Sequence, residues 1–219
     1  MTDTVYDMVI LGAGSGGYAA ALRGAQLGLR VALIEADKIG GTCLHRGCVP
    51  TKAILHSAET AEAVREAAAV GVRAAYQGLD MPAVQRYKNG VISRMYKGLQ
   101  GLVASRGIEV VGGWGRLVAR DTVEVSGRRY RGRNIVLATG SLSKTMGQEI
   151  SRPVMTSDQA LELDRVPASA VVLGGGVIGV EMASLMGLLG VPVTIVHAGP
   201  HILDREDEDV AAEVTAGLE

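Results

Sequence analysis

Residues 8–17 read Met8-Val9-Ile10-Leu11-Gly12-Ala13-Gly14-Ser15-Gly16-Gly17, an apolar run that meets a cluster of glycines. The apolar run predicts a buried strand, because strands of parallel sheets are covered on both faces. Gly12, Gly14 and Gly17 have the spacing of the dinucleotide-binding fingerprint, in which a strand, a glycine turn and a helix follow one another. We therefore expect an α/β fold of the Rossmann type, whose first turn binds a dinucleotide.

The residues that follow complete a β-α-β unit. An Ala-rich helix is predicted from Tyr18 to Leu27, and a second buried strand, Val31–Ile34, ends at Glu35. In the fingerprint the first glycine makes the turn, the second lets the backbone approach a pyrophosphate, and the third packs the helix on the strand. Because the helix N-terminus presents free N–H groups to the phosphate, Ser15 and Gly16 are expected at the cofactor together with the three glycines.

A second copy of this unit lies near the end of the sequence. An apolar run, Val171–Leu173, leads into Gly174, Gly176 and Gly179; a helix is predicted through Leu189, and a strand, Val193–Val196, ends at His197. Glu35 and His197 each lie 23 residues after the first glycine of their unit (35 − 12 and 197 − 174). A single fingerprint is weak, but two complete units at equal spacing predict two bound dinucleotides.

The two units differ at the residue that ends the second strand. Glu35 is a carboxylate in the place that accepts hydrogen bonds from a ribose diol. His197 can exchange a hydrogen bond with only one hydroxyl, and when protonated it can tolerate a 2'-phosphate. An equally weighted alternative is a surface histidine at the end of a strand. His197 is expected at the second cofactor, and it leaves both NAD and NADP open.

Both cysteines of the chain, Cys43 and Cys48, lie in one short segment. On an ideal helix this separation places the Cα atoms about 8 to 9 Å apart, whereas a disulfide usually needs less than about 7 Å. The segment must leave ideal helix if the pair closes, and Gly47 and Pro50 are suited to that. A strained, accessible bridge is readily reduced, so a redox pair is expected. The alternatives are a structural bridge or two unrelated buried thiols.

Lys52 lies four residues beyond Cys48, in the helix that Pro50 is predicted to start. Its ammonium can project toward the face that carries the sulfur, and a nearby cation and a helix N-terminus both favour the thiolate. The stretch from Met1 to Asp7 is acidic and lacks the basic region of a signal peptide, so a cytoplasmic location is expected. Persistent structural disulfides are rare in that compartment, which favours the redox interpretation.

Composition excludes several classes of partner. The 30 glycines among 219 residues are about twice the usual share, which indicates many turns or close backbone approaches. A net charge of −1 without basic clusters argues against nucleic acid. Val171–Val196 contains only Glu181 as a charged residue, but its glycines and Pro192 divide it into strand, helix and strand, so no membrane span is expected. No metal site is expected either.

The region between the two units predicts helices and short strands. The helices are expected at Thr51–Val70 and Met81–Arg106. A small antiparallel meander is expected from four short β-like pieces, around 109–111, 116–119, 122–125 and 128–130. A buried strand in 134–140 then returns to the first sheet. We place one dinucleotide-binding domain at 1–150 and the first part of a second at 151–219.

With these residues in hand, the chain resembles the pyridine nucleotide-disulfide oxidoreductases, and among them most closely the dihydrolipoamide dehydrogenases of the actinobacterial type. The most specific likeness is 41–52, supported by Ala138–Ser141 and Gly174–Glu181. The resemblance implies that the first unit binds FAD and the second NAD. It also implies the residues that line the FAD site, namely Gly41, Thr42, Lys52, Gly115, Thr139, Gly140 and Ser141.

The same resemblance implies roles for four side chains. Cys48 is the sulfur against the flavin, Cys43 exchanges with dihydrolipoamide, and Lys52 lies by the flavin and pairs with Glu181. An unpaired Glu181 buried in its apolar run would cost several kcal/mol, which supports a Lys52 partner over a helix turn that faces water. The expected activity is a flavoprotein dihydrolipoyl dehydrogenase that passes hydride to NAD.

The resemblance also predicts partners and an incomplete chain. The substrate is dihydrolipoamide or the lipoyl domain of a 2-oxoacid dehydrogenase complex, and the full-length protein is expected to be a homodimer. The sequence ends at Glu219, inside the second unit, so it corresponds to an N-terminal half, and turnover is expected of the longer protein. The family's His-Glu acid–base pair is not matched by His45, His56, His197 or His201. Alternatives are a glutathione-, mycothiol- or mercuric-type reductase that uses NADPH, and a flavin-binding fragment without turnover.

Overall fold

The computed structural model describes residues 5–218, which form two compact units. The first unit consists of the chain up to Pro50 together with Asn89–Met146, and the second of Thr51–Lys88 together with the chain from Gly147. The two units are defined by which parts of the chain pack together, and not by which parts bind a cofactor. The division into dinucleotide-binding domains at residue 150 therefore stays a prediction. The acidic stretch behind the expected cytoplasmic location lies mostly outside the described residues.

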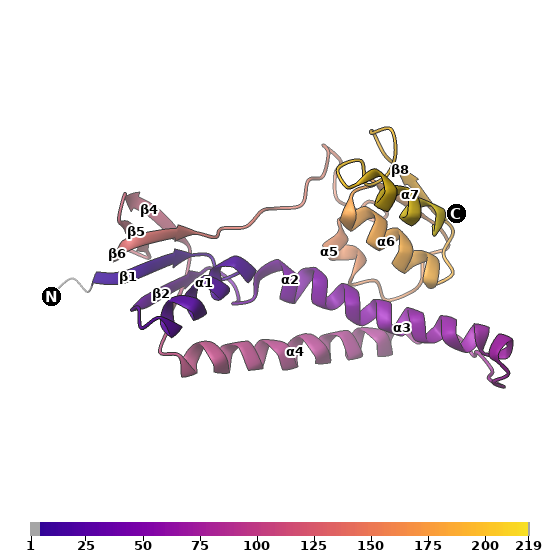
Figure 1. Ribbon diagram of the computed structural model, residues 1–219, viewed down its shortest axis with the longest axis horizontal. Helices are drawn as coiled ribbons and strands as arrows, with labels where there is room; N and C mark the ends of the chain where they lie inside the picture. Colours follow the sequence, from indigo (N-terminus) through magenta and orange to yellow (C-terminus); the bar gives the residue numbers. More distant parts are fainter. Residues whose placement is uncertain (1–4, 219) are drawn as a thin grey trace. The chain divides into compact units, whose positions relative to one another are not determined.

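The first unit is built on a six-stranded sheet with the order β3-β2-β1-β6-β5-β4. Figure 1 labels β1, β2, β4, β5 and β6 of this sheet. β1 pairs in parallel with β2 and β6, and β2 pairs in parallel with β3, whereas β4, β5 and β6 are antiparallel. The parallel pairing of β1 and β2 confirms the α/β fold. In chain order the strands are β1 (Val5–Leu11), β2 (Val31–Glu35), β3 (Glu109–Gly112), β4 (Gly115–Ala119), β5 (Thr122–Val125) and β6 (Arg128–Leu137).

The prediction of the meander was partly wrong. β4, β5 and β6 form it, but the segment at Glu109 is the parallel edge strand β3 beside β2. The two pieces predicted at 128–130 and 134–140 are one strand, β6, whose start pairs with β5 and whose remainder pairs with β1 from Arg131 to Leu137. A short apolar run indicates a strand but does not encode which strand it pairs with, and the tertiary packing decides this.

The apolar run of β1 is buried on both faces of the sheet, as its sequence predicts. Val9 packs on one side with Ala32 and Ile34, and Ile10 packs on the other side with Leu33 and Ala21. Ala21 belongs to α1 (Ser15–Gln26), which starts three residues earlier than predicted. Alternate residues of one strand thus pack into two cores, one on each face of the sheet, because successive side chains of a strand point to opposite faces.

The second unit repeats the β-α-β order. β7 and β8 are parallel, and α6 connects them, which confirms the second unit predicted from the sequence. Ile54 and Ala58 of α3 pack against Met182 and Leu185 of α6. The elements are α3 (Cys48–Glu66), the 3-10 turn η1 (Ala67–Val70), the start of α4 (Met81–Ser105), α5 (Ser157–Ala160), β7 (Ala170–Leu173), α6 (Val177–Leu188), β8 (Val193–Val196) and α7 (Glu208–Ala216). Within residues 5–218, no helix is both long enough and apolar enough to cross a membrane.

Candidate functional site: two dinucleotide turns and a cysteine pair

The first glycine turn admits no side chain at two of its positions. Gly12 has a φ of 98°, and a Cβ placed there would lie 2.2 Å from the Ala138 carbonyl oxygen. A Cβ at Gly17 would lie 1.9 Å from the Gly12 oxygen. Gly14 is the N-cap of α1 and has no side chain to cap it, so the first N–H groups of α1 are available to an anionic ligand. Ser15 and Gly16 are exposed at this end of the helix.

The start of α2 (Gly41–Arg46) lies against this turn. The Gly40 N–H donates to the Ala13 oxygen at 2.8 Å, and a Cβ at Gly41 would lie 2.5 Å from the Gly14 Cα. Two backbone segments therefore approach each other within the first unit. Thr42, the second residue of α2, is exposed beside them.

Other predicted residues of the first unit gather at the carboxyl ends of its parallel strands. Glu35 ends β2, and its carboxylate accepts hydrogen bonds from the Ala13 N–H at 2.7 Å and the Asp37 N–H at 2.9 Å. Thr139, Gly140 and Ser141 are exposed directly after β6. The crevice outside the carboxyl ends of parallel strands is where nucleotides bind in such sheets.

Gly115 has a packing role in the structure. It begins β4, and a Cβ at this position would lie 2.4 Å from Leu11 Cδ1 and 3.0 Å from Ile34 Cγ2. These contacts explain the glycine without a cofactor, so its role at the flavin stays a prediction.

The cysteine segment leaves ideal helix at Gly47, one of the two residues that the sequence marked as suited to such a break. α2 ends at Arg46, Gly47 has φ −140° and ψ −112°, and α3 begins at Cys48. The prediction that Pro50 starts the helix was wrong, because Pro50 lies within the first turn of α3, where a missing N–H costs no helical hydrogen bond. Cys43 is half-buried and Cys48 is exposed, and the disulfide between them stays a prediction.

A histidine anchors the helix that carries Cys43. His45 Nε2 donates to the Ile39 oxygen at 2.9 Å, and its ring meets Tyr96 edge-on with the centroids 5.0 Å apart. Sequence reasoning assigned His45 no role. Its place between the two cysteines was the only available signal.

Lys52 and Glu181 form an ion pair within the second unit, as expected. Lys52 follows Cys48 by one turn of α3, and Glu181 lies in α6. The Lys52 and Glu181 side chains are 61% and 31% exposed, so the carboxylate is half-buried and has the lysine as its partner. Such a pair contributes at most about 1 kcal/mol to stability. Glu181 also lines an open groove of about 530 Å³, together with Val177, Val180 and Leu203.

The glycine turn of the second unit repeats the first. Gly174 has a φ of 105°, and a Cβ at Gly179 would lie 1.9 Å from the Gly174 oxygen, the same approach as at Gly17. Gly176 is the N-cap of α6, and its Cβ position is open. The Gly175 N–H donates to His197 Nδ1 at 3.1 Å, which is the counterpart of the Ala13 bond to Glu35. His197 is thus anchored on the turn rather than simply exposed at the strand end.

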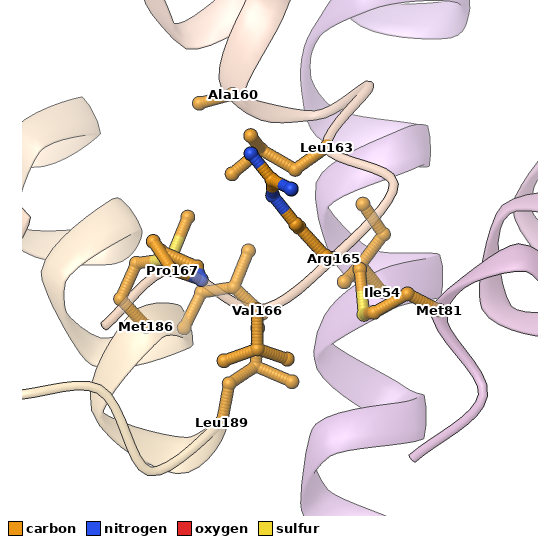
Figure 2. Close-up of a pocket in the computed structure, with 10 residues that line it drawn as sticks. Ile54, Met81, Ala160, Leu163, Arg165, Val166, Pro167, Met186 and Leu189 are labelled. Carbon is orange, nitrogen blue, oxygen red and sulfur yellow. The ribbon is translucent and has the colours of Figure 1, made fainter. Parts of the chain in front are cut away.

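A small cavity elsewhere in the second unit is a packing gap (Figure 2). It is lined mainly by apolar side chains, among them Ile54 of α3, Met81 of α4 and Met186 of α6, with Arg165 beside them. Its volume is about 10 Å³, the space of roughly one water molecule. It has no room for a dinucleotide.

Comparison with known proteins agrees with these features. Dihydrolipoyl dehydrogenase of Bacillus subtilis is 40% identical over 230 residues, covering 98% of this chain and 48% of the relative. That of Chlamydia pneumoniae is 40% identical, covering 96% and 46%. A solved Cu(II) complex of the HOCl-induced flavoprotein disulfide reductase RclA from Escherichia coli has a TM-score of 0.75 and 28% identity, covering 98% of this chain and 47% of that one.

The chain spans about half the length of the curated relatives it matches. A single family model, described as pyridine nucleotide-disulphide oxidoreductase, matches residues 6–219. This match covers both glycine turns, the cysteine segment and the Lys52–Glu181 pair. The chain belongs to the pyridine nucleotide-disulphide oxidoreductase family.

Proposed function

We propose that this chain forms the nucleotide-binding half of a dihydrolipoyl dehydrogenase, which oxidises dihydrolipoamide and reduces NAD. The observation that carries the proposal is the broken helix at Gly47, which sets Cys43 and Cys48 on separate helices, the first of which begins against the first glycine turn. Relatives with this name at 40% identity support the choice of substrate. The relatives that have this name are about twice as long as this chain.

The first unit fits FAD. The start of α1 has no side-chain cap, so its N–H groups can bind the pyrophosphate. Gly14 and Gly41 lie close together and have no side chains, so the backbone of both segments is accessible to the cofactor. Each oxygen of Glu35 accepts one backbone hydrogen bond and keeps a lone pair for a ribose hydroxyl. When bound, FAD supplies the two-electron chemistry between a dithiol and a nicotinamide.

The cysteines exchange electrons with the dithiol in two steps. A substrate thiolate attacks Cys43 Sγ, so the bond between the cysteine sulfurs breaks, a mixed disulfide forms and Cys48 leaves as a thiolate. The second substrate thiol, once deprotonated, attacks the substrate sulfur of the mixed disulfide and releases Cys43. The substrate leaves as a disulfide, and the two cysteines are left as the reduced pair that holds the two electrons. The dithiol has then lost two protons and two electrons: one proton is released, and the other, with the electron pair, makes up the hydride that bound FAD would pass to NAD.

The second unit is the proposed NAD site, because its glycine turn at Gly174, Gly176 and Gly179 has the conformation of the first turn. The proposed protein partner is the lipoyl domain of a 2-oxoacid dehydrogenase complex. The proposed assembly is a homodimer of the longer protein, in the cytoplasm. The names of the relatives support the lipoyl-domain partner through the activity that they state.

Two matched variants test the cysteine roles. We would purify the wild-type chain, C43S and C48S, measure the FAD released on denaturation, and record the long-wavelength absorbance of a thiolate beside a flavin. We expect all three to retain FAD, because the glycine turn is unchanged. C43S should show the band without a reductant, because its Cys48 cannot form the disulfide. The wild type should show the band only after partial reduction. C48S should not show it either before or after reduction.

The outcomes separate the parts of the proposal. A band in C48S would contradict the assignment of Cys48 to the flavin. Absence of flavin from all three proteins would contradict the cofactor assignment and favour a fragment without turnover. A preference of the longer protein for NADPH over NADH would favour a reductase that runs in the opposite direction.

A further inference from the structure

His197 uses the lone pair that a ribose hydroxyl would need. A neutral imidazole has one acceptor nitrogen, and in His197 that nitrogen, Nδ1, receives the Gly175 N–H at 3.1 Å. Glu35 meets the same demand in the first unit with lone pairs to spare. His197 therefore anchors the turn as Glu35 does but offers the ribose no acceptor.

The other ring nitrogen lies near a carboxylate. Because Nδ1 accepts, the ring proton lies on Nε2, which is buried and has no hydrogen-bond partner among residues 5–218. Asp204 Oδ2 lies 3.4 Å from it. The Asp204 side chain is 30% exposed, whereas that of His197 is 19% exposed, so a ligand can reach the carboxylate. Sequence reasoning missed Asp204, since nothing but its position seven residues after His197 signals it.

The loop that carries Asp204 is built against the glycine turn. Its Leu203 N–H donates to the Gly175 oxygen at 2.7 Å, and Leu203 adopts a φ of 56°. A Cβ at Gly199 would lie 2.3 Å from Asp204 Oδ2 and 2.7 Å from His197 Nε2. The absence of a side chain at Gly199 is thus what lets the imidazole and the carboxylate approach each other.

We propose that Asp204 supplies the carboxylate that accepts the hydrogen bonds of the NAD adenosine ribose, with His197 as its positioning residue. In the first unit Glu35 both accepts a hydrogen bond from the turn and has lone pairs for the ribose. In the second unit His197 accepts the hydrogen bond from the turn, and Asp204 accepts the hydrogen bonds of the ribose hydroxyls. Asp204 also repels a 2'-phosphate, which selects NAD over NADP. This inference rests on the proposed binding of NAD to the second unit.

Calorimetric titration of the chain with NAD⁺ and with NADP⁺ tests the proposal. D204N keeps the size of the side chain but removes its charge, and we expect it to weaken NAD⁺ about tenfold, the usual effect of losing a charged hydrogen-bond acceptor. The preference for NAD⁺ over NADP⁺ should fall with it. D164N removes the same charge from an exposed position in the same unit and should leave both affinities unchanged.

A rescue variant separates binding from folding. H197E places a carboxylate where Glu35 stands in the first unit, so H197E/D204N should regain NAD⁺ affinity and selectivity. Nitrogen-15 NMR of the His197 ring should show a proton on Nε2 and none on Nδ1, and D204N should shift the Nε2 signal.

Each contrary result has its own meaning. If the wild type binds NAD⁺ and D204N binds it equally well, the role of Asp204 is overturned while the NAD site stands. A proton on Nδ1 would also overturn it, because His197 would then not accept from Gly175. If neither the wild type nor H197E binds NAD⁺ or NADP⁺, the proposed NAD site fails and the inference fails with it.

Discussion

Tyr6 shows how one side chain joins elements that are not neighbours in the sheet. Tyr6 belongs to β1 and is 3% exposed, in the core that also contains Val9. Its hydroxyl donates to Glu109 Oε2 of β3 at 2.6 Å. Burial and then the hydrogen bond to Glu109 raise the pKa of Tyr6 to about 12. The phenol thus stays neutral well above the pH at which an exposed tyrosine ionises.

Tyr6 gives the fold a dependence on alkaline pH. Its folded pKa lies above the unfolded value of 10.0, so its contribution to stability is complete below pH 10.0 and is lost as the pH rises toward about 12. In a spectrophotometric titration we expect one phenol to ionise late, and Y6F to remove that step. Y87F, at an exposed tyrosine, is the control and should keep it. A wild type whose tyrosines all ionise together near pH 10.0 would refute the assignment.

At the scale of elements, the strand-turn-helix unit works because its glycines bring backbone against backbone. In both units the third glycine touches the oxygen of the first, and the helix that follows begins without a side-chain cap. The spacing in the sequence predicts these elements to within a few residues. The start of α3 at Cys48 was not predicted, because a proline in the first turn of a helix looks the same in sequence as one that begins it.

Adjacent glycines in α1 give a matched test of this packing. G17A places a methyl group 1.9 Å from the Gly12 oxygen and should lower the free energy of unfolding by about 2 to 4 kcal/mol, as overpacking against backbone does. G16A has no atom within 4 Å of its Cβ and should be neutral or stabilise the helix by up to about 1 kcal/mol. Urea unfolding measures both. Equal stabilities for the two variants would show that the backbone of the turn can shift to admit a methyl group at position 17.

At the scale of the molecule, the two copies of the unit differ in how much of the sheet is covered. β1 has a neighbour on each side and buried residues on both faces. β7 and β8 form a two-stranded sheet, whose Val171 and Leu173 are 66% and 57% exposed. A sheet of two strands with one apolar face in water is marginal by itself.

This difference predicts unequal protection of the two sheets. In native-state hydrogen exchange we expect the amides of β1 to exchange only with global unfolding of their unit, and those of β7 and β8 to exchange through smaller openings, at least about tenfold faster. Both sets are measured in one sample, so neither pH nor temperature differs between them. Equal protection would mean that α3 and α6 stabilise the small sheet as fully as six strands stabilise the large one.

The sequence by itself determined both β-α-β units and the turn glycines, and it marked Gly47 as a place where the cysteine segment can leave ideal helix. Local spacing carries these features, because a glycine turn and a helix start depend on a few neighbouring residues. The pairing of Lys52 with Glu181, 129 residues further along the chain, was expected only from the family resemblance. Only the tertiary structure decided that β3 joins the parallel edge, that Gly115 packs against Leu11, and that Asp204 meets His197. These contacts depend on which distant segments the fold brings together, and the spacing of residues along the chain does not record that.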